Sequence, residues 1–116
     1  DTRAVNDRMI ALLSQYGITI DGIFFCPHSP EEGCLCRKPR PGMVYQAIDN
    51  LGFSLEHTAI IGDKACDIEL GKSLGIRTIL VKSGYGAGQA ASLSNTADYI
   101  AESIDGAAKW LSRKHF

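Results

Sequence analysis

The sequence lacks an apolar run long enough to span a membrane, and its positive and negative charges nearly cancel. Its 116 residues include 12 Lys and Arg and 13 Asp and Glu, for a formal net charge of −1. A charge near zero gives no general case for nucleic acid or an acidic membrane as the partner. No signal peptide, internal repeat or linker is recognisable. The length fits a single domain, residues 1–116, that buries roughly two-thirds of its unfolded surface.

Cysteine is also scarce, with four in the chain, and three of them fall within the eleven residues from 26 to 36. Two disulfides in a secreted protein are one reading of this count. Cys34 and Cys36 lie too close together to form independent bridges easily, and a histidine lies among the thiols. The sequence therefore favours a reducing compartment, and we expect the protein in the cytoplasm. Cys66 lies apart and is expected to be a free, buried thiol.

The loop that holds the three clustered cysteines is polar and rich in Pro, Gly and Glu, so it has little apolar surface to fix its shape. A tetrahedral Zn²⁺ bound by three thiolates and one imidazole would fix it. Four protein ligands close the coordination sphere, which favours a structural ion over a catalytic one. The alternative is a loop with free thiols and a surface histidine. The expected ligands are Cys26, His28, Cys34 and Cys36.

The spacing of apolar residues predicts helices that alternate with strands. Helices are expected over 5–16, 41–51, 68–74 and 103–111, and strands over 22–26, 58–61, 76–81 and 97–100. This alternation predicts an α/β fold, with a parallel sheet and helices on its faces. Residues that follow the strands then meet at one edge of the sheet, where such folds bind ligands.

Three polar segments are expected at that edge. Asp63 follows a strand and a glycine that is expected to let the backbone turn tightly, and its carboxylate suits Mg²⁺. Asp67 would support the same ion or the loop; equally, Asp63 caps the next helix and Asp67 is a solvated acid of its first turn. Arg37 and Lys38 are either an anion site beside the last thiol or a solvated pair. The glycine-rich segment 83–88 lacks the spacing of a P-loop, opens no clear long helix, and is expected to be a flexible rim element.

These motifs resemble the haloacid-dehalogenase superfamily of phosphatases. Cys-Pro-His after a strand, then Cys-x-Cys-Arg-Lys-Pro, then Ile-Gly-Asp-Lys-x-x-Asp-Ile, are similar to its zinc-containing branch over roughly residues 21–86. The branch includes heptose-bisphosphate phosphatases and histidinol-phosphate phosphatases. The continuation Arg-Lys-Pro-Arg-Pro-Gly-Met and the stretch Ser-Gly-Tyr-Gly are more like the former. The resemblance implies a Rossmann-like fold and Mg²⁺-dependent removal of the 7-phosphate of a heptose bisphosphate, a step of lipopolysaccharide heptose synthesis, through an aspartyl phosphate.

The resemblance also implies roles for single residues. Lys38 would be the catalytic cation that neutralises the transferring phosphoryl group, and Arg37 would contact the substrate. Asp63 would hold the Mg²⁺, with Asp67 as a supporting acid. Lys64 would contact the substrate and lend its backbone oxygen to the ion. The structural zinc would preorganise the two cations that follow its last ligand.

One part of the family pattern is missing from the sequence. The nucleophile and the general acid of the family come from an Asp-x-Asp motif, which does not occur here. We therefore expect a chain that corresponds to the carboxyl-terminal two-thirds of the family fold and is inactive alone. Its sheet would expose an apolar edge, where the missing segment or a second copy pairs. The alternative class is a non-catalytic zinc module; few clustered cations and no interleaved aromatic residues argue against nucleic acid as its partner.

Overall fold

The computed structural model describes residues 2–17, 19–24, 38, 40–93 and 96–113. Helices and strands alternate from residue 42 onward, as the apolar spacing predicted. In chain order the elements are α1 (Thr2–Ser14), α2 (Gly42–Leu51), the 3-10 turn η2 (Leu55–His57), β1 (Ala59–Gly62), α3 (Ala65–Leu74), β2 (Arg77–Val81), α4 (Gly86–Leu93), β3 (Tyr99–Ala101) and α5 (Ile104–Ser112).

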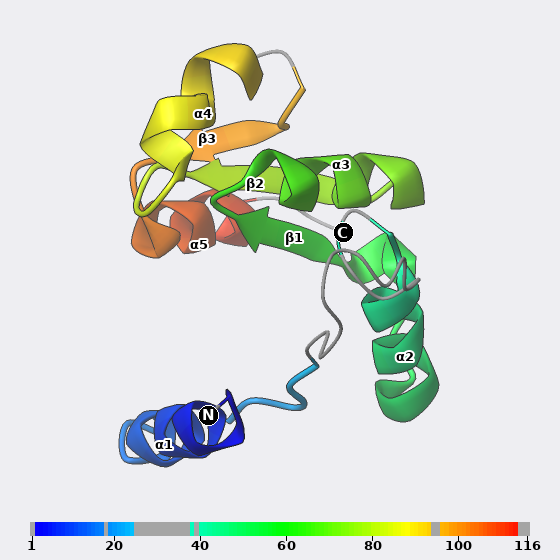
Figure 1. The fold of residues 1–116 in the computed structure, drawn as a ribbon, viewed down its shortest axis with the longest axis vertical. Coiled ribbons are helices and arrows are strands. Elements are labelled where there is room, and N and C mark those ends of the chain that lie inside the picture. The colour runs from blue at the N-terminus through cyan, green and yellow to red at the C-terminus, as the bar shows by residue number, and fades with distance from the viewer. Residues whose placement is uncertain (1, 18, 25–37, 39, 94–95, 114–116) are drawn as a thin grey trace.

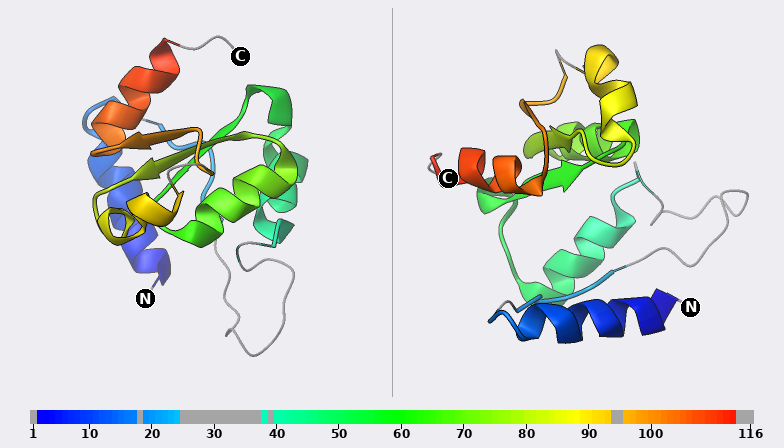
Figure 2. Two further views of the ribbon diagram at one scale, coloured as in Figure 1. Left: turned by 90° about the horizontal axis from the view of Figure 1, so that it is seen from above. Right: turned by 90° about the vertical axis from the view of Figure 1, so that its left-hand side faces the viewer.

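The three strands form one parallel sheet in the order β1-β2-β3. Helices α3 and α4 lie on one face of this sheet and α5 lies on the other (Figures 1 and 2). The predicted α/β fold is therefore confirmed. The layers follow from the strands themselves, because successive side chains of β2 point to opposite faces and both faces are apolar.

Among the described residues, two small apolar clusters make up the core, one on each face of the sheet. Ile79 and Val81 of β2 pack with Ala107 and Trp110 of α5. Leu80, between them in sequence, points the other way and packs with Ile68 of α3 and with alanines of α3 and α4. Ile68, Ile79 and Leu80 are all 0% exposed. Burying each of these side chains stabilises the fold by about 1.5–3 kcal/mol.

Most element ends agree with the glycine signals of the sequence. Gly52 and Gly75 end α2 and α3 in the left-handed conformation, with φ of 72° and 71°. The backbone N–H of Gly75 donates to the carbonyls of Gly71 and Lys72. These carbonyls lie at the end of the helix, where the helix itself offers no N–H donors. Tyr99 of β3 and Trp110 of α5 stack with ring centroids 5.0 Å apart.

The strand predicted over 22–26 is wrong for the part that the structure describes. Gly22, Ile23 and Phe24 form no strand, whereas Phe25 and Cys26 lie outside the described residues. A strand requires a hydrogen-bonding neighbour. In the described sheet, β1 pairs with β2 only, so residues 22–24 do not pair with its outer edge and form no ladder.

Two helices on the sheet differ from the sequence prediction, since α3 begins earlier than expected and α4 was not predicted. Helix α3 begins at Ala65 rather than Ile68. Helix α4 begins at Gly86, inside the segment that was predicted as a flexible rim element. The backbone N–H of Ala87 donates to the carbonyl of Lys82 over 3.0 Å, and Ala90 packs against the α3 face of the sheet. These tertiary contacts hold a helix that the glycines alone do not favour.

Helix α1 lies away from the sheet (Figure 1). Its apolar side chains Val5, Leu12 and the following Tyr16 are exposed. Across the described residues, no helix is both long and apolar enough to cross a membrane.

Candidate active site

The carboxyl ends of β1 and β2 lie side by side and carry the polar residues of the site. Gly62 of β1 pairs with Leu80 of β2 in parallel register, so both strands end at the same edge. Asp63 and Lys64 follow β1, and the turn 83–85 follows β2. Residues that are 22 apart in sequence thus meet at the edge where α/β folds bind ligands.

An ion pair joins Lys38, before α2, to Asp67 in the first turn of α3. Lys38 Nζ donates to Asp67 Oδ1 over 2.6 Å. The Asp67 side chain is 7% exposed and that of Lys38 is 41% exposed, so the ammonium also faces solvent. Asp67 Oδ2 accepts the backbone N–H of Lys64 over 3.3 Å. The carboxylate therefore caps α3 with one oxygen and fixes the Lys38 ammonium with the other.

These contacts exclude one of the two interpretations of Asp63 and Asp67, whereas their role at a Mg²⁺ ion stays a prediction. The interpretation in which Asp63 caps the helix and Asp67 is solvated is wrong, because Asp67 is buried and itself accepts the N–H of the N-cap residue Lys64. The physical reason is the early start of α3 at Ala65. That start turns the Asp67 side chain toward the end of β1.

Gly62 makes room for the buried carboxylate. A Cβ atom at this position would overlap the side chain of Asp67. The backbone of Gly62 is not left-handed: the positive-φ glycines of the described chain are at positions 17, 52, 75 and 84. The prediction that this glycine permits a tight turn is therefore wrong, and its role is close approach of a neighbouring group.

Asp63 is held by the turn that follows β2. Its Oδ2 atom accepts the backbone N–H of Tyr85 over 3.2 Å. Within the described part of the chain, no hydrogen bond reaches its Oδ1 atom. One carboxylate oxygen at the rim thus stays available, which fits a Mg²⁺ ion that takes one or two protein carboxylates and completes its shell with water and phosphate.

Lys64 lies beside the same turn. Its Nζ atom lies 4.7 Å from the centroid of the Tyr85 ring, in a cation–π contact. Its backbone oxygen accepts the N–H of Asp67 over 3.1 Å. A carbonyl has two lone pairs, so the predicted contact of this oxygen with a metal remains compatible with that bond.

The structure therefore brings four of the predicted site residues to one rim: Lys38, Asp63, Lys64 and Asp67. Arg37 and the predicted zinc ligands Cys26, His28, Cys34 and Cys36 lie outside the described residues. Among the described residues there is no group of three or more His, Cys, Asp or Glu side chains that could hold a metal ion. Cys66 is free but half-buried rather than buried.

Sequence reasoning missed three contributors to the site. Gly84, with φ +67°, and Tyr85 shape the turn against Asp63. Gln89 of α4 accepts the backbone N–H of Ala65 at the start of α3. A glycine-rich stretch directly after a strand was the available signal, but its partners across the rim follow from the sheet and not from local sequence.

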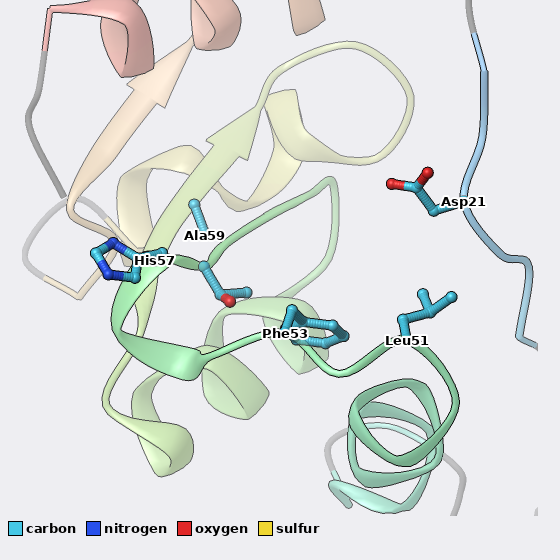
Figure 3. Close-up of a pocket in the computed structure, with 6 residues that line it drawn as sticks. Asp21, Leu51, Phe53, His57 and Ala59 are labelled. Atoms are coloured by element: carbon cyan, nitrogen blue, oxygen red, sulfur yellow. The ribbon is translucent and has the colours of Figure 1, made fainter.

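Two cavities in the described part of the chain are lined by neither Asp63 nor Asp67. A cavity of about 720 Å³ lies at the amino end of β1, lined by Leu51, Phe53 and Ala59 among others, with Asp21 facing it from the segment after α1 (Figure 3). A smaller cavity of about 240 Å³ lies between α2, β1 and α3 and is lined by apolar side chains and Lys38. The ion pair and hydrogen bonds, rather than cavity size, identify the candidate site.

Known proteins match the part of the chain that contains this rim. The family model described as "HAD-hyrolase-like" matches residues 35–107, which include all four rim residues. The chain is similar to D-glycero-beta-D-manno-heptose-1,7-bisphosphate 7-phosphatase of Pseudomonas putida, at 39% identity over 83 residues that cover 72% of this chain and 47% of the relative. It is also similar to the histidine biosynthesis bifunctional protein HisB of Actinobacillus pleuropneumoniae, at 38% identity over 74 residues that cover 64% of this chain and 20% of the relative.

A solved structure has the same fold. The D,D-heptose 1.7-bisphosphate phosphatase from B. bronchiseptica, complexed with magnesium and phosphate, is 31% identical with a TM-score of 0.87. The match covers 98% of this chain and 64% of that chain. The chain spans about half the length of the heptose-bisphosphate phosphatases that it matches in sequence. With the family model covering well over half of its residues, the chain belongs to the HAD-like hydrolase family.

Proposed function

We propose that this chain is the part of a sugar-bisphosphate phosphatase that binds Mg²⁺ and the phosphoryl group. The whole protein would remove the 7-phosphate of D-glycero-D-manno-heptose 1,7-bisphosphate. The observation that carries the proposal is the Lys38–Asp67 ion pair beside Asp63 at the carboxyl edge of β1. Relatives at 36% to 41% identity are named for this activity, and the solved relative holds magnesium and phosphate.

In this proposal Lys38 supplies fixed positive charge to the phosphoryl group. An ammonium has three N–H donors, and Asp67 takes one of them in the structure. The others face solvent at the rim, where a phosphoryl oxygen would accept them. Because Asp67 already holds the ammonium, little reorganisation is needed as negative charge develops.

Asp63 would hold the Mg²⁺ through Oδ1, with the backbone oxygen of Lys64 and the supporting acid Asp67 nearby. When bound, Mg²⁺ neutralises charge on the phosphoryl oxygens. Arg37 would contact the second phosphate of the substrate. No Asp-x-Asp motif occurs in the 116 residues, so we propose that the nucleophile is supplied by residues outside this sequence, and that these 116 residues alone are inactive.

We also propose a structural Zn²⁺ bound by Cys26, His28, Cys34 and Cys36, which would fix the loop that leads into Arg37 and Lys38. The protein would act in the cytoplasm, in the synthesis of the heptose of lipopolysaccharide. The outer edge of β1, unpaired within the described sheet, would pair with the missing amino-terminal segment or with a second copy.

Histidinol-phosphate phosphatase is the second candidate, because HisB proteins are similar to the chain at 32% and 38% identity. The test is a phosphate-release assay of the full-length protein with both substrates at several Mg²⁺ concentrations. We expect kcat/KM for the heptose bisphosphate to exceed that for histidinol phosphate by at least about tenfold. The opposite order would assign the second activity. Hydrolysis of neither substrate, with zinc bound, would favour a non-catalytic zinc module.

A further inference from the structure

The turn after β2 and helix α4 contact three consecutive residues that follow β1, which are Asp63, Lys64 and Ala65. Tyr85 N–H bonds the Asp63 carboxylate, the Tyr85 ring covers the Lys64 ammonium, and Gln89 accepts the backbone N–H of Ala65. We propose that the Gly84–Tyr85 turn is a positioning element that fixes Asp63 for Mg²⁺ and Lys64 for the sugar phosphate. This inference rests on the proposed function for the identity of the two ligands.

The backbone of the turn orients the Asp63 carboxylate. The Tyr85 N–H occupies Oδ2 over 3.2 Å and leaves Oδ1 toward the rim. Gly84 has φ +67°, and a Cβ atom there would lie 2.5 Å from the same Oδ2 atom. Only glycine leaves the space that this oxygen occupies, so the turn and the carboxylate fit each other closely. Outer contacts of this kind tune how a ligand binds its metal.

The turn is itself held on both sides, which makes it able to position other groups. A Cβ atom at Gly86 would overlap the carbonyl of Val81, so the chain folds back tightly on the end of β2. The N–H of Ala87 donates to the carbonyl of Lys82 over 3.0 Å. Helix α4 then presents Gln89 to the start of α3.

The Tyr85 side chain acts on Lys64. The ring is 66% exposed, so it buries little apolar area in the fold. Its contact with the Lys64 ammonium, 4.7 Å from the centroid, keeps that cation beside Asp63 at the rim. An ammonium over a ring still has N–H donors free for a phosphate or hydroxyl oxygen of the substrate. The ring is therefore a positioning group for substrate binding, separate from the backbone effect on Asp63.

The backbone effect is tested with two glycine substitutions that carry the same conformational strain. Gly84→Ala and Gly75→Ala both place a side chain at a φ near +70°, but nothing lies within 4 Å of a Cβ at Gly75. The readout is Mg²⁺ affinity of the full-length protein without substrate, measured by calorimetric titration. We expect Gly84→Ala to weaken affinity about tenfold and Gly75→Ala to lower only the melting temperature. Equal affinities of the two variants would overturn the proposal.

The ring effect is tested with Tyr85→Ala against Tyr85→Phe, which both keep the backbone N–H. We expect Tyr85→Ala to raise KM for the sugar bisphosphate severalfold without changing Mg²⁺ affinity, and Tyr85→Phe to change neither. An unchanged KM in Tyr85→Ala would remove the ring from the proposal. If the wild-type protein binds Mg²⁺ but hydrolyses no sugar bisphosphate, the proposed function fails while the Gly84 comparison still decides the positioning of Asp63.

Discussion

The ion pairs of this chain differ in how much they contribute to stability, because their side chains differ in burial. The Lys38–Asp67 pair has one partner at 7% exposure, whereas the Lys82–Glu102 pair, at 3.2 Å, is 40% and 84% exposed. Water screens the second pair and competes for its hydrogen bonds. The Lys38–Asp67 pair also anchors the N-terminus of α3, so its loss affects both a helix cap and the cation that we propose for catalysis.

This difference predicts the outcome of two amide substitutions. Asp67→Asn should destabilise the protein by about 1–3 kcal/mol, because Lys38 loses a charged acceptor inside a partly buried site. Glu102→Gln should change the free energy of unfolding by less than about 0.5 kcal/mol. Urea denaturation of the two variants measures both values. A cost for Glu102→Gln as large as that for Asp67→Asn would contradict the role given to burial.

The carboxyl group of Asp98 should make the stability of the protein depend on pH. Asp98 immediately precedes β3, at the edge of the sheet opposite the candidate site. Burial raises the pKa of its carboxyl, but hydrogen bonds from Thr78 and the ammonium of Lys72, 3.0 Å away, outweigh this and lower the pKa overall. A lowered pKa in the folded state contributes stability above the unfolded pKa, and that stability is lost as the pH falls through the folded value.

Asp98→Asn should therefore lower the melting temperature at pH 7, and the difference from wild type should shrink below about pH 4. Asp105→Asn, which breaks the exposed pair with Lys109, is the control and should show little effect at either pH. Thermal melts from pH 3 to 8 measure the dependence. A deficit of Asp98→Asn that stays constant across this range would show that the carboxylate charge is not what stabilises this edge.

Among the elements, α3 lies closest to the sheet. A Cβ atom at Gly71 would overlap Thr78 Cγ2 and lie 2.7 Å from Ile60 Cγ2. Helix propensity alone would favour alanine there by about 1 kcal/mol, so local and tertiary preferences oppose each other at this position. Close packing of the helix on β1 and β2 is what holds the first turn, with Asp67, over the end of β1.

Two helix glycines should therefore respond in opposite directions to alanine. Gly71→Ala should destabilise the protein by about 1–3 kcal/mol through overpacking against Thr78 and Ile60. Gly106→Ala in α5 should stabilise it by about 0.5–1 kcal/mol, because its Cβ would lie at an ordinary 3.5 Å from Ala101 Cβ. Chemical denaturation distinguishes the two signs. Stabilisation by Gly71→Ala would mean that α3 can move away from the sheet at no cost.

At the scale of the whole molecule, the sheet brings distant segments together at one rim, which the proposed metal ions would complete. Lys38 and Asp67 are 29 residues apart in sequence, and Asp63 and Tyr85 are 22 apart. The proposed zinc would add the loop before Lys38 to this assembly. Removal of the zinc is then expected to disturb the position of Lys38 and to leave the strands unchanged.

Native mass spectrometry should find one zinc per chain in the wild-type protein. Cys34→Ser should lose the ion and lower the melting temperature, because the loop loses its only proposed crosslink. Cys66→Ser, which changes a free thiol in α3, should keep the zinc. A wild-type protein without zinc, or a Cys34→Ser variant that retains it, would refute the proposed ligand set.

The sequence by itself determined the order of the elements from residue 42 onward, apart from α4, because apolar spacing and terminal glycines act locally. It also determined the family, since Lys38, Asp63 and Asp67 stand at the spacing of its motifs. The rim was predictable as well, because parallel strands place their carboxyl ends together. These are properties of periodicity, turn chemistry and chain direction, which need no knowledge of distant contacts.

Only the tertiary structure decided which residues of the rim are buried and which of them pair with one another. Local sequence left open whether Asp63 binds a metal or caps α3, and whether Asp67 supports that metal or is solvated. The space beside Gly62 decided that Asp67 is buried against β1 and pairs with Lys38. Likewise the glycines of 83–88 indicated a loop, whereas packing on the sheet made α4 and brought Tyr85 to Asp63. The reason is physical: a side chain's hydrogen bonds and burial depend on neighbours that the sheet, and not the adjacent residues, supplies.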